Sequence, residues 1–196
     1  LYADGQELPI LVTGEKDGSF DLGDAVEFYG LGLDTASTDA RTYWLVVGSN
    51  PGKRIGQVTS GANRLGAGAF PQVVERKDRT IYFAALRNGD KENFFGAVIA
   101  GAPVDQALTL KHLAATSTGQ AALEVALQGV TNVPHRVRIE VNGKSAGEMS
   151  FDGQVARVTR FELPQAQLKD GQNVIRLTPL AGASDVSLVD YIRVTY

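Results

Sequence analysis

The chain has 196 residues, of which 43% are hydrophobic and 21% charged, and its net charge is -3. This composition is ordinary for a globular protein of one or two domains, and it offers no basic field for nucleic acid or for an anionic membrane surface. Cysteine is absent, which excludes disulfides, thiolate metal sites and thiol catalysis. No run of about 18 apolar residues occurs, so membrane insertion is not expected.

The first third of the chain is predicted to be a small β unit. The sequence starts at Leu1 within a strand-like stretch, so we expect an excised or processed piece of a longer chain whose targeting signal is gone. Short apolar strands are predicted at 8–12, 25–29 and 41–47, the last (RTYWLVV) containing the single tryptophan. Turn segments rich in glycine and aspartate separate them.

A segment of small residues, 59–68 (TSGANRLGAG), is the predicted joint between two β units, 1–66 and 67–196. After it, residues 80–86 and 93–99 are predicted to pair as a hairpin around Asn88-Gly89-Asp90. The second unit therefore begins with antiparallel strands.

The clearest strand pattern lies between Leu123 and Phe151. Apolar residues alternate with polar ones at 123–128 and again at 136–141, which is the period of a strand with one buried face. Asn142-Gly143 follows directly and indicates a two-residue turn, because both residues tolerate the positive φ angles that this turn needs. The sequence predicts an antiparallel hairpin here.

The end of the chain supplies further strands. A Lys169-Asp170-Gly171 turn precedes a strand at 174–177, and two more strands are predicted at 186–188 and 192–196. One helical turn is expected at 164–168. Many short strands ended by Gly, Asn or Asp predict an all-β protein whose C-terminal unit is a jelly roll or β-sandwich resembling carbohydrate-binding modules, with two sheets around one core.

An acidic loop in the first unit offers a candidate metal site. Asp17, Asp21 and Asp24 lie at offsets around Gly18 that partly match a calcium loop, and a hard cation needs about six to eight oxygen ligands. The closing bidentate glutamate and the flanking helices of such a loop are missing. The favoured alternative is a solvated turn whose carboxylates bond nearby backbone amides.

Tyr43 and Trp44 are the candidate ligand-binding residues, because aromatic rings stack on the C–H face of a sugar. Strand alternation places them on opposite faces, so core packing of at least one ring is favoured. Phe94-Phe95 is open between an interface patch and core filling. His112 and His135, the two histidines, are expected to be structural or solvent-facing rather than catalytic.

Several segments together resemble a known family. DGQELPILV, DGSFDLGDAVEFYGLGLDT, RTYWLVVG, ERKDRTIYFAAL, ENFFGAVI and VSLVDYIRVTY resemble the β-rich region that precedes the catalytic domain of gingipain-type cysteine peptidases and their bacterial relatives. The resemblance covers nearly the whole chain. It implies a secreted or cell-surface bacterial protein, accessory to a peptidase domain that lies beyond Tyr196.

The family's catalytic residues are a cysteine and a histidine, and a chain without cysteine carries over neither position. We therefore expect a non-catalytic accessory module with no cofactor beyond structural calcium. Its expected partner is the catalytic domain of the same parent chain, reached by protein–protein packing or surface tethering. The alternative is a carbohydrate-binding module that recognises a polysaccharide. A docking module should expose an apolar patch, whereas a sugar-binding module should expose aromatic rings beside polar groups.

Overall fold

The structure is a computed structural model. It describes residues 1–35, 38–56, 70–87, 93–114 and 119–196. The chain divides into two compact units, Leu1–Ala67 and Gly68–Tyr196. Both consist of strands, with two short 3-10 turns and no α-helix in the described part, so the all-β prediction is confirmed. The predicted joint at 59–68 lies outside the described residues.

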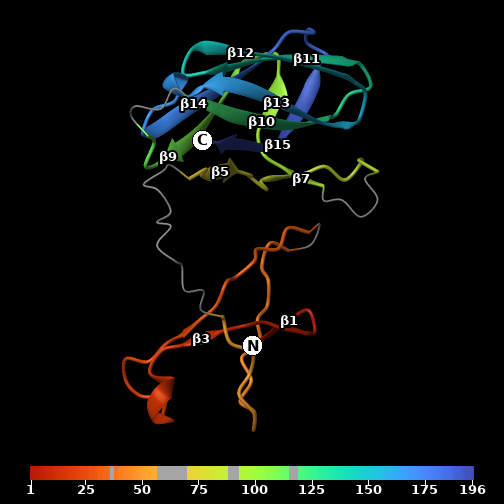
Figure 1. The fold of residues 1–196 in the computed structure, drawn as a ribbon. Coiled ribbons are helices and arrows are strands. Elements are labelled where there is room, and N and C mark those ends of the chain that lie inside the picture. The colour runs from red at the N-terminus through yellow and green to blue at the C-terminus, as the bar shows by residue number, and fades with distance from the viewer. Residues whose placement is uncertain (36–37, 57–69, 88–92, 115–118) are drawn as a thin grey trace. The chain divides into compact units, whose positions relative to one another are not determined.

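The second unit is a sandwich of two antiparallel sheets (Figure 1). One sheet has the order β13 (Ala156–Pro164), β10 (Gln120–Gly129), β15 (Val186–Thr195) and β5 (Val73–Arg76), and the short β8 (Val98–Ala100) also pairs with β15. The other has the order β12 (Lys144–Asp152), β11 (Pro134–Val141), β14 (Gly171–Pro179) and β9 (Val104–Leu110). The predicted β-sandwich with two sheets is confirmed.

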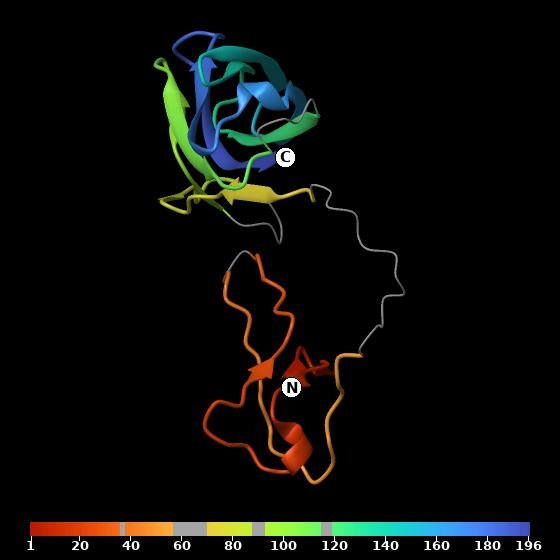
Figure 2. The ribbon, with the colours of Figure 1, turned by 60° about the vertical axis from the view of Figure 1, so that its left-hand side comes forward.

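The two sheets face each other in the turned view of Figure 2. The buried apolar side chains between them form one hydrophobic core. Along β11 the apolar residues Val137, Ile139 and Val141 are buried, and the residues between them face outward. The facing sheet contributes Leu123, Val125 and Leu127 of β10 among others. Period-two alternation therefore sets which side of each strand faces the core.

The hairpin predicted at Asn142-Gly143 is confirmed. Val141 pairs with Lys144 across the turn, and the φ angles of Asn142 and Gly143 are 52° and 79°. Positive φ at both central residues is the geometry that matches the twist of the flanking strands. The helical turn predicted at 164–168 is also present, as a 3-10 turn (η2) at Gln165–Gln167.

Two expectations about strands in this unit are corrected. Residues 186–188 and 192–196 were expected as separate strands, but 186–195 form the single β15, with a bulge where Ala126 pairs with Tyr191 and Leu127 with Val189. The extra residue of this bulge is Asp190. It shifts the alternation of buried and exposed residues by one position, so one strand looks like two in the sequence. Of the predicted wet face of β10, Ala126 and Gln128 are buried, at 2% and 1% exposed, between two neighbouring strands, whereas Glu124 is partly exposed.

A short hairpin flanks the sandwich. β6 (Ile81–Tyr82) and β7 (Phe94–Phe95) pair antiparallel, so the hairpin predicted from 80–86 and 93–99 is present as a short pair, whereas residues 98–99 belong to β8 and pair with β15. The Asn88-Gly89-Asp90 turn lies outside the described residues. Phe95 is buried against Leu86 and Leu188, whereas Phe94 is 37% exposed and lies against Tyr82. Phe95 therefore fills a small core and Phe94 does not.

The first unit has very short elements: β1 (Tyr2–Ala3), β2 (Gln6–Glu7), β3 (Leu11–Val12), the 3-10 turn η1 (Glu15–Asp17) and β4 (Val26–Glu27). β1 pairs with β2, and β3 pairs with β4. The strand predicted at 41–47 is not formed, because its pairing is limited to one bridge between Trp44 and Tyr2. This segment has the residues of a strand, but among the described residues no neighbouring strand completes a ladder with it.

Candidate functional site

The first unit leaves most of its large apolar side chains exposed. Its buried hydrophobic residues are Leu1, Ala3 and Ile10, in the part that the structure describes. An exposed apolar set, by contrast, is at least half exposed: Phe20, Leu22, Tyr29, Leu31, Trp44, Leu45, Val46 and Val47. Leu22 and Val47 are as open as in an extended chain, at 107% and 99%. Exposed apolar surface of this kind marks binding surfaces.

Tyr43 and Trp44 do not form a common platform. The Tyr43 ring is half-buried, lies with its centroid 5.0 Å from that of Phe28, and its hydroxyl donates to the Leu31 carbonyl oxygen over 2.7 Å. Trp44 is 65% exposed, and among the described residues its backbone bridges to Tyr2. Tyr43 is thus the ring taken up by packing, as expected of at least one of the two, and a role of either ring in ligand binding stays a prediction.

The acidic loop uses its carboxylates on its own backbone. Asp17 accepts a hydrogen bond from the Ser19 amide over 3.0 Å, and Asp24 accepts one from the Asp21 amide over 2.8 Å. Gly14 approaches so closely that an added Cβ would lie 1.8 Å from an Asp24 carboxylate oxygen. No group of three or more His, Cys, Asp or Glu side chains in the described residues is arranged to hold a metal ion. The calcium site therefore stays a prediction.

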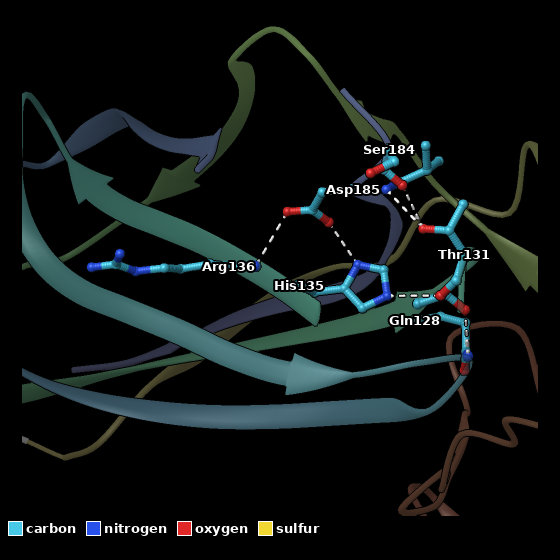
Figure 3. Close-up of polar contacts among 8 residues, drawn as sticks. Gln128, Thr131, His135, Arg136, Ser184 and Asp185 are labelled. Carbon is cyan, nitrogen blue, oxygen red and sulfur yellow. Dashed lines mark hydrogen bonds and ion pairs between the residues drawn. The ribbon is translucent and has the colours of Figure 1, made fainter. Parts of the chain in front are cut away.

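A buried polar cluster lies at one end of the sandwich (Figure 3). His135 Nδ1 lies 2.6 Å from Asp185 Oδ1, and their side chains are 0% and 1% exposed. The second carboxylate oxygen accepts the Arg136 backbone N–H over 3.2 Å. Nε2 of the same ring faces the Thr131 carbonyl oxygen at 3.1 Å, and the ring stacks on Phe151 with centroids 4.7 Å apart.

This geometry fits a structural role for His135. Both of its ring nitrogens lie within hydrogen-bond distance of an oxygen atom, a carboxylate oxygen on one side and a carbonyl oxygen on the other. A base needs one nitrogen free and close to a nucleophile. The pair instead links the start of β11 to the segment before β15, and the structural role expected for His135 is confirmed.

His112 is exposed and has a φ angle of 60°, in agreement with a solvent-facing role. The partners of His135 could not be found from the sequence. Asp185 lies 50 positions away, in a polar segment that resembles any surface loop. Only the register of the two sheets brings the two residues together.

The outer face of the β13-β10-β15-β5 sheet carries a row of alternating charges. Arg160, Glu124, Arg193 and Glu75 are cross-strand neighbours in that order, and ion pairs of 3.6, 3.1 and 2.6 Å join them. The aromatic residue of this face, Tyr191, lies under the Arg193 guanidinium at 4.7 Å. Burial raises the pKa of Tyr191. A flat row of stacking aromatics is therefore not what this face presents.

The outer face of the other sheet is charged in the same way. Arg176 makes a bidentate pair with Asp105, with both N···O distances at 2.7 Å. Hydrogen bonding to Arg176 lowers the pKa of Asp105. The pair lies in the cross-strand row that continues to Glu140. Charged side chains on both outer faces keep the sandwich surface polar.

We expect the Arg176→Ala variant to raise the pKa of Asp105 back toward the ordinary value of an aspartate, because the guanidinium donors are removed. A carboxylate with a depressed pKa contributes stability above its ordinary pKa and loses it as pH falls through the depressed value. An NMR titration of the Asp105 carboxyl measures the shift. An unchanged titration curve would contradict the assignment, and Arg157→Ala on exposed β13 serves as the control.

A shallow depression of about 420 Å³ lies where β11 begins and β12 ends, lined by Pro134, Arg136, Ser150, Asp152 and Leu180 among others. Its volume falls within the usual range for small-ligand sites. Phe151, which also lines it, is 8% exposed and belongs to the core. The depression therefore lacks an exposed ring on which a sugar would stack.

No protein-family model matches the sequence, and no curated protein matches it. Among solved structures, the chain is similar in fold to latent dimeric PorU from Porphyromonas gingivalis, with a TM-score of 0.55 and 12% identity. That match covers 72% of this chain and 14% of PorU, so the chain spans a small part of the protein it matches. This likeness shows the fold alone.

Carbohydrate-binding modules are also among the matches, with lower scores. The CBM36-1 domain of a multidomain xylanase from the hindgut metagenome of Trinervitermes trinervoides matches with a TM-score of 0.41 and 12% identity, over 64% of this chain and 96% of that domain. A CBM36 module in complex with calcium and xylotriose matches with a TM-score of 0.40 and 13% identity, over 62% of this chain and 97% of that module.

None of the helical turns in the described residues has the length and apolarity of a membrane span.

Proposed function

We propose that this chain is a non-catalytic β-sandwich accessory module of a secreted, gingipain-like peptidase, and that it acts by packing against another domain of the same parent chain. The observation that carries the proposal is the exposed apolar set of the first unit. Among the described residues of this unit, three hydrophobic residues are buried and eight large ones are at least half exposed. A unit this small and open gains little from its own core and much from a partner.

The sandwich of the second unit also supports the proposed function. Its core is continuous and its outer faces are covered by paired charges, so it is built as a rigid support. The resemblance to the region upstream of gingipain-type catalytic domains, and the fold likeness to a part of PorU, fit a module within a longer chain. That the module is secreted is part of this proposal.

The test compares the isolated chain with the parent polypeptide by hydrogen–deuterium exchange. We expect the peptide that covers 41–47 to exchange at least about tenfold more slowly in the parent, because docking buries it. A peptide that covers β12, whose outer face is charged, serves as the control. It should exchange at the same rate in the isolated chain and in the parent polypeptide. Equal exchange of the 41–47 peptide in both forms would refute docking through this unit.

The second candidate function is carbohydrate binding, which is favoured by the exposure of Trp44 and Tyr29, at 65% and 81%. As the single tryptophan, Trp44 reports directly on binding near it. If a sugar stacks on this ring, soluble polysaccharides should blue-shift its fluorescence and give a calorimetric signal, and Trp44→Ala should abolish both. Absence of any signal at millimolar sugar would rule this candidate out.

A further inference from the structure

The segment Trp44–Val47 contradicts its own sequence pattern. Five consecutive apolar residues, Tyr43 to Val47, are typical of a strand that is buried on both faces. In the structure Trp44, Leu45, Val46 and Val47 are 65%, 65%, 59% and 99% exposed. A local pattern that disagrees with its surroundings in this way marks a functional position more often than an accident of folding.

The backbone of this segment is also open. Trp44 exchanges two hydrogen bonds with Tyr2, from its N–H over 2.8 Å and to its carbonyl over 2.9 Å. Within the part of the chain that the structure describes, the N–H and C=O groups of Leu45, Val46 and Val47 have no backbone partner. Unpaired backbone groups beside apolar side chains are the features by which one strand adds to another sheet.

The Trp44–Tyr2 pair fixes which side is available. In an antiparallel ladder both polar groups of a residue point to one side, and those of the next residue point to the other. A strand continuing from this pair turns the N–H groups of Leu45 and Val47 away from Tyr2 and that of Val46 toward it. The backbone N–H groups of Leu45 and Val47 therefore point to the open side of the segment.

We infer that Tyr43–Val47 is added as a strand to the edge of a β-sheet in another domain of the parent polypeptide, with Leu45 and Val47 forming the new ladder. This inference rests on the proposed function and specifies the chemistry of its partner. Residues 42–47 carry no charge, so the matching edge is apolar and uncharged beside the ladder. Side chains on both faces of the segment are then covered, as its sequence pattern requires.

Single-residue hydrogen–deuterium exchange on the parent polypeptide and on the isolated chain tests this inference. In the parent, the amides of Leu45 and Val47 should exchange about 100-fold more slowly than in the isolated chain, and that of Val46 should remain the fastest of the three. Equal slowing of all three amides would overturn strand addition while leaving docking intact. Slowing of none would overturn both.

Two proline variants give a matched pair. Leu45→Pro removes a donor on the open side, and Val46→Pro removes one on the side of Tyr2, where the ladder does not need it. We expect Leu45→Pro to abolish the protection of Val47 in the parent and Val46→Pro and Leu45→Ala to retain most of it. Equal loss in both proline variants would overturn the inference. Concentration-dependent protection in the isolated chain would do so too, by assigning the strand to a second copy.

Discussion

The Asp185→Asn variant is expected to lower the free energy of unfolding of the second unit by about 3–5 kcal/mol. The carboxylate faces the His135 ring at 2.6 Å and the Arg136 backbone N–H at 3.2 Å, in a site where both side chains are almost fully buried. An asparagine offers one acceptor oxygen where the carboxylate offers two, so either the His135 ring or the Arg136 N–H loses its partner. A buried group left without its partner costs its full desolvation.

Chemical denaturation followed by far-ultraviolet circular dichroism measures this loss. Asp152→Asn removes the same charge from an exposed residue at the end of β12, and it should change the unfolding free energy by less than about 0.5 kcal/mol. If Asp185→Asn unfolds at the same denaturant concentration as the unaltered chain, the buried pair does not stabilise this end of the sandwich.

Gly129→Ala is expected to cost about 1–3 kcal/mol or more, because the site is filled from two sides. A Cβ at this position would lie 2.1 Å from the Gly153 carbonyl oxygen and 2.7 Å from His135 Nε2. Neither neighbour moves freely. The Gly153 backbone donates to Val133, and the Gly129 backbone donates to Val155, each over 3.0 Å.

The same measurement of unfolding applies, with Gly32→Ala as the control for the general effect of replacing glycine. An added Cβ at Gly32 meets no atom within 4 Å, so the substitution should be neutral or slightly stabilising. If Gly129→Ala leaves the free energy of unfolding unchanged, the backbone at this end of the sandwich moves to accommodate the added methyl group. The contact between β10 and the His135 cluster would then not be rigid.

Both predictions concern the same buried cluster around His135. Gly129 ends β10, His135 is the second residue of β11, and Asp185 precedes β15, so the cluster connects three strands of two sheets at one end of the core. The shallow depression lies next to the cluster, since His135 lines it together with Pro134 and Leu180. A loss of the pair should therefore loosen this end before the hairpin at Asn142-Gly143, and amide exchange in the two variants would reveal the order.

The sequence by itself determined the strand at 136–141, the turn that follows it and the residues of this strand that face the core. Alternation at 136–141 and the Asn142-Gly143 turn are local signals, because a period of two and a pair of positive φ angles need no distant contact. The same reasoning failed for 41–47, where the strand pattern is present and the partner strand is not. A strand is completed by its neighbour, and a local pattern carries no information about whether one is there.

Only the tertiary structure decided the rest. It joined 186–188 and 192–195 into one strand through a bulge at Asp190, buried Ala126 and Gln128 of β10, and brought Asp185 to His135. Each of these depends on the register between strands that are far apart in the sequence, and register is set by the packing of the whole core. The exposure of Trp44 became visible in the same way, since burial is a property of neighbours and not of a residue.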